Sequence, residues 1–295
     1  MNLNTHKMEG MDMADIRASG YSPTIKKRAL SRKLVDLRKQ CGMTTAQVCR
    51  QLNWSHTKLN YIEKAKWVEP SSDAVADLCE LYGVEGSDRE ALIKLTREAR
   101  QRGWWRRYND VFRDDFVGLE AGASEIYAFQ TTLVPGLLQT PGYVEMINRD
   151  AGMVDDDELK RHIDARTQRQ MILTRRSSPC RFHALIDENA LLRISNPQVR
   201  SEQIRHLIKV SGRPNVDVQI LKIADGVYPG TSEPFVYLKF PGAADRDIVY
   251  LETTIDDRMM EEEDELERYM ARFDLLRARA TDPAATSAYL TRLIE

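Results

Sequence analysis

The sequence predicts a multidomain protein, with an N-terminal all-α bundle followed by an α+β domain that contains a small, mostly antiparallel sheet. Three observations support this prediction. The chain has 295 residues, which is long for one domain. Capped segments with helical spacing begin at residue 25, whereas short β-rich segments bounded by turn residues begin only after residue 180. We expect a flexible tail over residues 1–22, a helical domain over 23–102 and an α+β domain over 103–295.

The composition is typical of a soluble globular protein, with 42% hydrophobic residues, 30% charged residues and a mean hydropathy of -0.49. No stretch approaches the roughly 18 apolar residues that span a bilayer. The first twenty residues also lack a signal-peptide core, so we expect a cytoplasmic protein. The four cysteines have no CxxC spacing and no nearby histidine pair, which favours buried free thiols over a zinc or redox site.

The net charge of -2 is unevenly distributed along the chain. Residues 1–111 carry 20 Lys or Arg against 14 Asp or Glu, whereas residues 112–295 carry 23 against 31. The basic excess is strongest over residues 24–66, where 11 basic residues face only two acidic ones. This pattern is typical of a module that binds nucleic-acid phosphates, although charge alone also fits a solvated helical face.

Apolar spacing and caps define the first two helices. Apolar residues recur at helical spacing from Ile25 to Gln40, and Cys41-Gly42 supplies the stop. Thr44 and Gln47 have the spacing of a capping box. A second helix is therefore expected from about Thr45 to Leu52.

A tight turn is expected between the second and third helices. Asn53 tolerates the left-handed conformation that such a turn requires, and Ser55 is a suitable N-cap. Small Cys49 stands where the two helices would approach most closely. The apolar residues expected to be buried at their crossing are Val48, Leu52, Trp54, Leu59 and Ile62. Together these features predict a helix-turn-helix. Two further helices are expected to begin at Pro70-Ser71 and at the capping box Ser87-x-x-Glu90, which completes a five-helix bundle.

Residues Ile25 to Val84 resemble the Cro and lambda-repressor-like (XRE) family. The matching positions are Gly42-Met43-Thr44, Val48-Cys49, Leu52-Asn53-Trp54-Ser55, Leu59, Ile62-Glu63 and Pro70-Ser71. Thr45 stands where the family often has glutamine, and Asn53 where glycine is common. The resemblance implies a lambda-repressor-like bundle that binds double-stranded DNA, with Glu63 paired to Arg38.

In that geometry the helix from Ser55 to Lys64 enters the major groove with its N-terminal residues toward the bases. We expect His56, Thr57 and Asn60 to read base edges, because asparagine pairs with adenine and threonine offers a hydroxyl or a methyl group. The residues expected to contact phosphates are Thr45, Lys58, Tyr61 and Lys64. The full predicted DNA-binding set is Thr45, Ser55, His56, Thr57, Lys58, Asn60, Tyr61 and Lys64. One unit would contact few phosphates, so a homodimer on half-sites about 34 Å apart is expected.

The second domain begins with helical patterns. The basic segment Arg97–Arg107 joins the two domains, and its Trp104-Trp105 pair is too apolar for a free linker, so we expect it to dock on the domain that follows. Residues from Glu120 to Ile147 are expected to be mainly helical, with an interruption at Pro135-Gly136. Another helix is expected from Asp157 to Arg175.

Four later segments have the composition and turn boundaries of strands. They are Arg181–Asp187, Val216–Leu221, Pro234–Phe240 and Asp247–Thr253. Helices are expected near Glu188–Ile194, Gln198–Val210, Met259–Ala280 and Pro283–Leu293.

Residues 103–293 look like the C-terminal domain of WhiJ-like actinobacterial regulators. The matching segments are Gly103-Trp104-Trp105, Leu119-Glu120-Ala121, the run from Leu133 to Tyr143, Arg169-Gln170, Asp187 to Leu191, Pro214-Asn215-Val216 and Val249 to Glu252. The resemblance implies transcriptional control, often beside a gene for a small partner protein in an arrangement resembling toxin and antitoxin. We therefore expect a sequence-specific DNA-binding transcriptional regulator whose C-terminal domain senses such a partner.

Two alternatives remain open, namely a one-component regulator whose C-terminal domain binds a small-molecule effector and an interaction module that has lost DNA binding. An enzyme is not expected, because HExxH, GxSxG, Walker-type and GxGxxG motifs are missing from the sequence. Asp187-Glu188 or Asp155-Asp156-Asp157 could form acid–base pairs, with His183 or His206 as a base. Adjacent carboxylates at a helix start more often cap the helix. We expect no catalytic residue, cofactor or metal.

Overall fold

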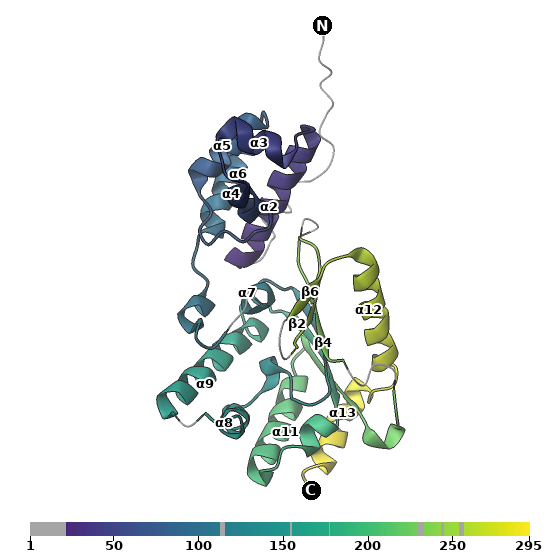
Figure 1. The fold of residues 1–295 in the computed structure, drawn as a ribbon. Coiled ribbons are helices and arrows are strands. Elements are labelled where there is room, and N and C mark those ends of the chain that lie inside the picture. Colours follow the sequence, from purple (N-terminus) through teal and green to yellow (C-terminus); the bar gives the residue numbers. More distant parts are fainter. Residues whose placement is uncertain are drawn as a thin grey trace. The chain divides into compact units, whose positions relative to one another are not determined.

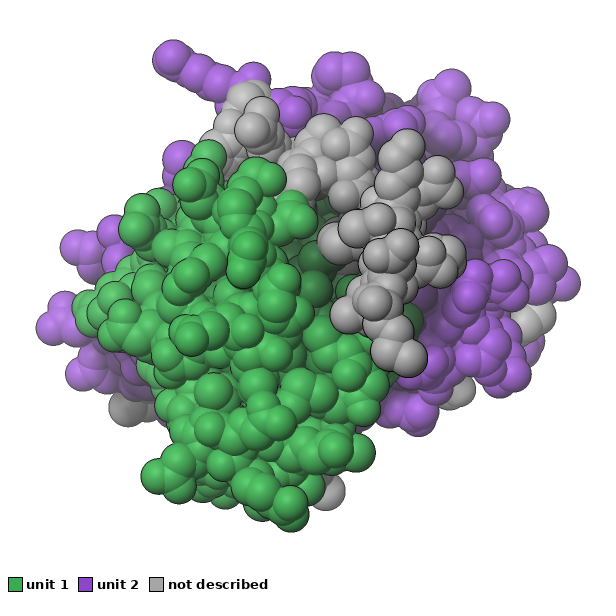
Figure 2. Space-filling view, turned by 90° about the horizontal axis from the view of Figure 1, so that it is seen from above, with its two compact units in different colours: residues 1–103, 240–246 green, residues 104–239, 247–295 purple. Residues whose placement is uncertain are grey.

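The computed structural model describes residues 22–112, 116–153, 155–176, 178–228, 233–242, 245–253 and 257–295. The chain divides into two compact units (Figure 2). Unit 1 comprises Met1–Gly103 and Phe240–Arg246, and unit 2 comprises Trp104–Lys239 and Asp247–Glu295. Apart from Ser22, the tail predicted over residues 1–22 lies outside the described residues.

Five helices form the described part of unit 1 (Figure 1). They are α2 (Pro23–Gln40), α3 (Thr45–Leu52), α4 (His56–Glu63), α5 (Ser72–Leu81) and α6 (Gly86–Ala99). Their apolar faces share one core, whose most deeply buried members include Leu30, Leu34, Val48, Leu78 and Leu95. The predicted helical bundle is confirmed.

The helix starts that were predicted from caps in unit 1 are confirmed with one exception. The Ser71 hydroxyl accepts a hydrogen bond from the Ala74 backbone N–H at 3.3 Å and begins α5 as predicted. The predicted capping box at Ser87 is wrong, because α6 begins at Gly86 and its N-cap, Glu85, makes no side-chain cap bond. Gly86 has a φ of 58°, a left-handed value that glycine adopts readily, and Ser87 already lies inside the first turn of α6, so the serine is not at the N-cap position.

Unit 2 alternates helices with strands. Its strands are β1 (Glu125–Gln130), β2 (Arg181–Asp187), β3 (Val216–Leu221), β4 (Phe235–Lys239), β5 (Ile248–Leu251) and β6 (Arg258–Met260). Its α-helices are α7 (Phe116–Glu120), α8 (Pro141–Asp150), α9 (Asp156–Gln170), α10 (Asn189–Leu192), α11 (Pro197–Ser211), α12 (Glu263–Arg277) and α13 (Pro283–Arg292). Four 3-10 turns complete the described elements, namely η1 (Trp104–Tyr108), η2 (Gly136–Leu138), η3 (Met171–Leu173) and η4 (Ile223–Asp225).

The described strands form one mixed sheet in the order β3-β2-β1-β4-β5-β6. Strand β1 is parallel to β2 and antiparallel to β4, and β2 is parallel to β3. The pairs β4–β5 and β5–β6 are antiparallel. Parallel pairs need long crossovers, which α8 and α9 supply between β1 and β2, and α10 and α11 between β2 and β3. The predicted small, mostly antiparallel sheet is therefore wrong.

The central strand β1 lies inside the segment that was predicted to be mainly helical. Its four inner residues, Ile126 to Phe129, are all buried, so the strand shows no polar alternation in its sequence. A short apolar run of this kind cannot be told from a buried helix by periodicity alone. The helix prediction from Glu120 is therefore wrong over β1, and residues 131–140 contain only the 3-10 turn η2 before α8 begins at Pro141.

The other missed strand is β6, which has only three residues. It was assigned to the start of the long helix predicted from Met259, but α12 begins at Glu263. Met260 and Met259 pair with Val249 and Tyr250 of β5, and these contacts make the edge strand. The strands predicted at Arg181–Asp187 and Val216–Leu221 match β2 and β3.

Helices cover both faces of the sheet (Figure 1). On one face, α12 packs Phe273 against Tyr127 of β1 and Phe235 of β4, with ring centroids 5.1 and 6.4 Å apart. The group α8, α9 and α11 lies on the other face, where α13 packs against α11 and β3. Within the described residues, no helix combines the length and the apolarity that a bilayer crossing requires.

The segment at the start of unit 2 packs on α9. Arg107 Nη2 donates to Gln168 Oε1 at 2.7 Å, and the guanidinium of Arg161 bonds the Arg107 carbonyl. Trp105 is buried within η1, and Trp104 makes an edge contact with it at 5.9 Å. The tryptophan pair therefore belongs to a turn that docks on this domain, as predicted.

All four cysteines are free thiols. Cys49, Cys79 and Cys180 are buried as predicted, and burial raises the pKa of Cys180 to about 12. Cys41 departs from the prediction because it is exposed at the C-terminal end of α2, where the helix ends.

Candidate nucleic-acid interface

Local hydrogen bonds set the turn between α3 and α4. Thr44 and Gln47 complete the predicted capping box, with the Thr44 N–H donating to Gln47 Oε1 at 2.8 Å and the Thr44 hydroxyl accepting from the Gln47 N–H at 3.3 Å. Asn53 ends α3 in the left-handed region, with φ 51° and ψ 43°. The backbone N–H groups of Asn53 and Trp54 both donate to the Cys49 carbonyl. These bonds fix the direction in which the chain enters α4.

Helix α4 is anchored through one face. The Ser55 hydroxyl caps it by accepting a hydrogen bond from the Lys58 N–H at 3.1 Å. Leu59 and Ile62 are only 1% and 3% exposed, and both belong to the unit 1 core as predicted. Because residues three apart share a helix face, the opposite face of α4 is left to solvent.

All eight side chains of the predicted DNA-binding set are exposed on unit 1. Thr45 lies at the start of α3 and Ser55 at the N-cap of α4. The others lie along α4 and at its C-cap, namely His56, Thr57, Lys58, Asn60, Tyr61 and Lys64. The fold therefore brings the set onto the α3–α4 segment, while the role of each residue as a base or phosphate contact stays a prediction.

The predicted phosphate contact Lys58 has a defined neighbour. Its Nζ lies 3.5 Å from the centroid of the Trp54 ring, which is a cation–π geometry. Trp54 is partly buried and packs on the unit 1 core, as expected for a packing residue. Sequence reasoning missed this contact, and the i, i+4 rule for helix surfaces does not signal it because Trp54 precedes the N-cap of α4. The indole holds the ammonium beside the first turn of α4.

An ion pair ties α4 to α2. Arg38 Nε and Nη2 donate to the two carboxylate oxygens of Glu63 at 2.6 and 3.1 Å, and Arg38 Nη1 donates to the Met43 carbonyl at 2.9 Å. The side chains of Arg38 and Glu63 are 13% and 14% exposed. The hydrogen bond to Glu63 raises the pKa of Arg38. The pair that the family resemblance implied is confirmed, and it fixes α4 in the bundle.

Two family models match the chain. One, described as a helix-turn-helix domain, matches residues 29–92 and includes α3 and α4. The other, described as a domain of unknown function (DUF5753), matches residues 113–292, which is more than half of the chain. The chain belongs to the DUF5753 family. No curated protein and no solved structure matches it. The helix-turn-helix match supports a DNA-binding regulator.

The acidic pair Asp187-Glu188 is fully engaged within the DUF5753 domain. Asp187 accepts hydrogen bonds from the Asn189 N–H at 2.8 Å and from the Tyr228 hydroxyl. Glu188 accepts from the Ile223 N–H at 2.8 Å and from the Tyr289 hydroxyl at 2.6 Å. Burial and these carboxylate bonds raise the pKa of both tyrosines. The two carboxylates thus tie β2 and α10 to η4 and α13.

A second buried carboxylate in the DUF5753 domain belongs to Glu120, which is 3% exposed. Arg169 of α9 contacts it through two hydrogen bonds, Nε to Oε1 at 2.5 Å and Nη2 to Oε2 at 2.7 Å. The Arg169 guanidinium also lies 5.3 Å from the Phe116 ring, which stacks on Tyr250 at 4.1 Å. Two segments that carry the WhiJ-like resemblance, around Glu120 and Arg169, therefore meet in one ion pair.

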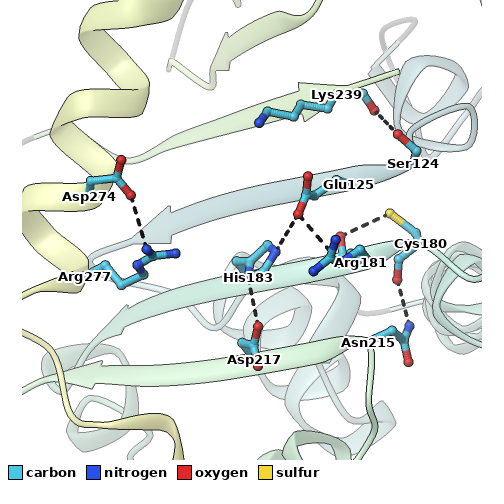
Figure 3. A network of polar contacts seen from close by, with 10 residues as sticks. All are labelled: Ser124, Glu125, Cys180, Arg181, His183, Asn215, Asp217, Lys239, Asp274 and Arg277. Carbon is cyan, nitrogen blue, oxygen red and sulfur yellow. Dashed lines mark hydrogen bonds and ion pairs between the residues drawn. The ribbon is translucent and has the colours of Figure 1, made fainter. Parts of the chain in front are cut away.

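His183 lies at the centre of a polar network on the sheet (Figure 3). Its Nε2 is 2.9 Å from Glu125 Oε1, its Nδ1 is 2.9 Å from Asp217 Oδ2, and its ring stacks on Tyr127 with a 4.6 Å centroid separation. Burial opposes ionisation of Glu125, but hydrogen bonds with His183 and Tyr127 outweigh it and lower the pKa of Glu125. The network links neighbouring strands β1, β2 and β3. Among the residues that the structure describes, His, Cys, Asp and Glu form no group able to hold a metal ion.

Proposed function

We propose that this protein is a sequence-specific DNA-binding transcriptional regulator that reads its operator with α4. The observation that carries the proposal is that the two faces of this helix differ. Leu59 and Ile62 on its inner face are buried in the core, while the side chains predicted to read DNA are exposed. Helices presented in this way enter the major groove of DNA in helix-turn-helix proteins.

Base reading is assigned to His56 and Thr57 in the first turn of α4 and to Asn60 one turn later. The asparagine amide can accept a hydrogen bond from adenine N6 and donate one to adenine N7. Threonine offers a hydroxyl or a methyl group. The phosphate contacts assigned to this surface are Thr45, Lys58, Tyr61 and Lys64. Because one unit reaches few phosphates, we assign a homodimer that places two α4 helices on half-sites about 34 Å apart.

Replacing Asn60 with alanine is expected to weaken binding to the cognate site by about 1 to 3 kcal/mol and to leave binding to random duplexes nearly unchanged. The loss is selective because only base edges distinguish the two kinds of duplex. The measurement is a gel-shift titration of the full chain against a site selected from a random-sequence library. Asn109→Ala, which truncates an exposed asparagine in unit 2, is the matched control. An equal loss on random DNA would contradict the assignment of Asn60.

Replacing Lys64 with glutamine is expected to weaken binding to every duplex alike and to reduce the slope of log affinity against log salt by about 1. Each neutralised phosphate releases condensed counterions, and the slope reports their number. Lys94→Gln removes the same charge from an exposed position of α6 and should leave the slope unchanged. If the affinity of the unmodified chain for DNA does not fall with salt, the protein is instead an interaction module that has lost DNA binding.

For the DUF5753 domain we propose a regulatory role in which it senses a small partner protein encoded nearby, in an antitoxin-like arrangement. The support is the resemblance to WhiJ-like regulators. A small-molecule effector is the second candidate, and one observation favours it: a groove of about 430 Å³ opens between α8 and the α10 region. Tyr143, Met146, Ile147 and Ile194 give it apolar walls, with Arg193 among its polar lining residues. We assign no catalytic activity, because the acidic pair Asp187-Glu188 is used in structural hydrogen bonds.

A further inference from the structure

Arg166 of α9 is partly buried but makes no hydrogen bond, ion pair or ring contact with the residues that the structure describes. Its neighbour Arg169, one turn further along the same helix, is bonded to Glu120 through two nitrogens. A guanidinium carries five N–H donors. No Arg166 nitrogen is among the fully buried unpartnered atoms of the described residues, so these donors still reach solvent and are available to a ligand.

Both guanidinium groups reach the same point of the chain. A Cβ placed on Gly136, at the start of η2, would lie 2.9 Å from Arg166 Nη1 and 3.1 Å from Arg169 Nη1. The backbone of Gly136 does not have a positive φ, so the glycine is explained by space and not by conformation. Any larger residue at this position would push into the two cationic groups. The absence of a side chain therefore leaves room where two positive charges converge.

The electrostatics leave Arg166 without a close counterion. Burial, together with the nearby charge of Arg169, lowers the pKa of Arg166 to about 10, so the group remains a cation near neutral pH. Glu120 is already bonded through both oxygens to Arg169. Glu252 is exposed and interacts with both arginines only at longer range, because no ion pair joins it to either of them in the described structure.

We propose that Arg166, supported by Arg169 beside Gly136, binds an oxyanion of a ligand, either a carboxylate or a phosphate group. The planar fork of a guanidinium matches both groups and can form two parallel hydrogen bonds with either. Arg169 cannot swing away, because Glu120 and the Phe116 ring hold it, and it adds a fixed positive charge. The site belongs wholly to the DUF5753 domain and does not depend on DNA binding.

The experiment measures the melting temperature of the full chain against increasing inorganic phosphate or acetate, with ionic strength held constant by sodium chloride. A ligand that binds only the folded state raises the melting temperature in a saturable way. The unmodified chain is expected to respond to at least one anion, and the comparison of the two arms identifies the preferred oxyanion. Arg166→Gln should lose the response. Lys160→Gln, which removes an exposed charge from the same helix, should retain it.

Two further variants keep the test decisive. Arg166→Lys keeps the charge but loses the fork, and it should raise the apparent Kd for the anion at least fivefold. Glu252→Gln removes a carboxylate that interacts electrostatically with both arginines, and it should lower the apparent Kd for the anion. Without anion, Arg166→Gln should melt no lower than the unmodified chain, because the arginine has no partner to lose. An equal response in Arg166→Gln, or no response of the unmodified chain to either anion, would overturn the assignment.

Discussion

Replacing Arg169 with methionine is expected to lower the free energy of unfolding of the DUF5753 domain by about 3 to 5 kcal/mol. The reason is the environment of Glu120. Its side chain is 3% exposed, and Arg169 donates a hydrogen bond to each of its carboxylate oxygens. Removing the guanidinium leaves a buried carboxylate without a counterion. The loss is measured by hydrogen exchange of α9 amides across a urea series in the full chain.

Two variants separate this effect from a general loss of charge. The double variant Arg169→Met with Glu120→Leu should recover most of the stability, because a buried ion pair can be replaced by apolar groups at little net loss. Lys160→Met removes an exposed charge from the same helix and should change stability by less than about 0.5 kcal/mol. A loss below about 1 kcal/mol for Arg169→Met would mean that Glu120 finds another partner.

Replacing Arg38 with methionine is expected to lower the stability of the helical bundle by about 3 kcal/mol and to weaken DNA binding in parallel. Glu63 at the end of α4 would lose both hydrogen bonds from Arg38, and the Met43 carbonyl would lose a donor. The exchange rates of the α4 amides, measured in the full chain, should rise. DNA affinity should fall because α4 is no longer held at one orientation.

The controls for this prediction lie on the same helices. Lys39→Met removes an exposed basic residue adjacent to Arg38 and should leave α4 exchange unchanged. The double variant Arg38→Met with Glu63→Met should restore much of the protection, because neither side chain then carries an unpaired charge. Faster α4 exchange without any change in DNA affinity would contradict the proposed part of α4 in binding.

The helical unit could be predicted almost completely because its determinants are local. The capping box at Thr44, the left-handed Asn53 and the Ser55 cap each act within four residues, so a single sequence reveals them. The error at Ser87 arose where two local signals competed, since the glycine before it set the helix start. The Arg38–Glu63 pair spans 25 residues and was expected only through the family resemblance.

The sheet of unit 2 was harder to predict from the sequence, because the strand order depends on contacts between segments that are far apart in the chain. Strand β1 is apolar on both faces and pairs with residues 181–186 and 235–239, so neither its type nor its place is visible locally. The unpartnered state of Arg166 is likewise a property of the packed domain. No motif marks it, whereas the paired Arg169 lies in a segment that the resemblance had already singled out.

The position of β1 also has a consequence for synthesis of the chain. Both neighbours of this strand come later in the sequence, the second only at Phe235–Lys239. At translation rates of about 5 to 20 residues per second, the β1–β2 pair waits roughly 3 to 10 seconds for that neighbour, counted from the completion of β2 at Asp187. During this interval the nascent chain presents an open, apolar strand edge, a state prone to association with other chains. Ribosome-associated chaperones are therefore expected to engage this protein midway through its second unit, after the helices of the first have already emerged.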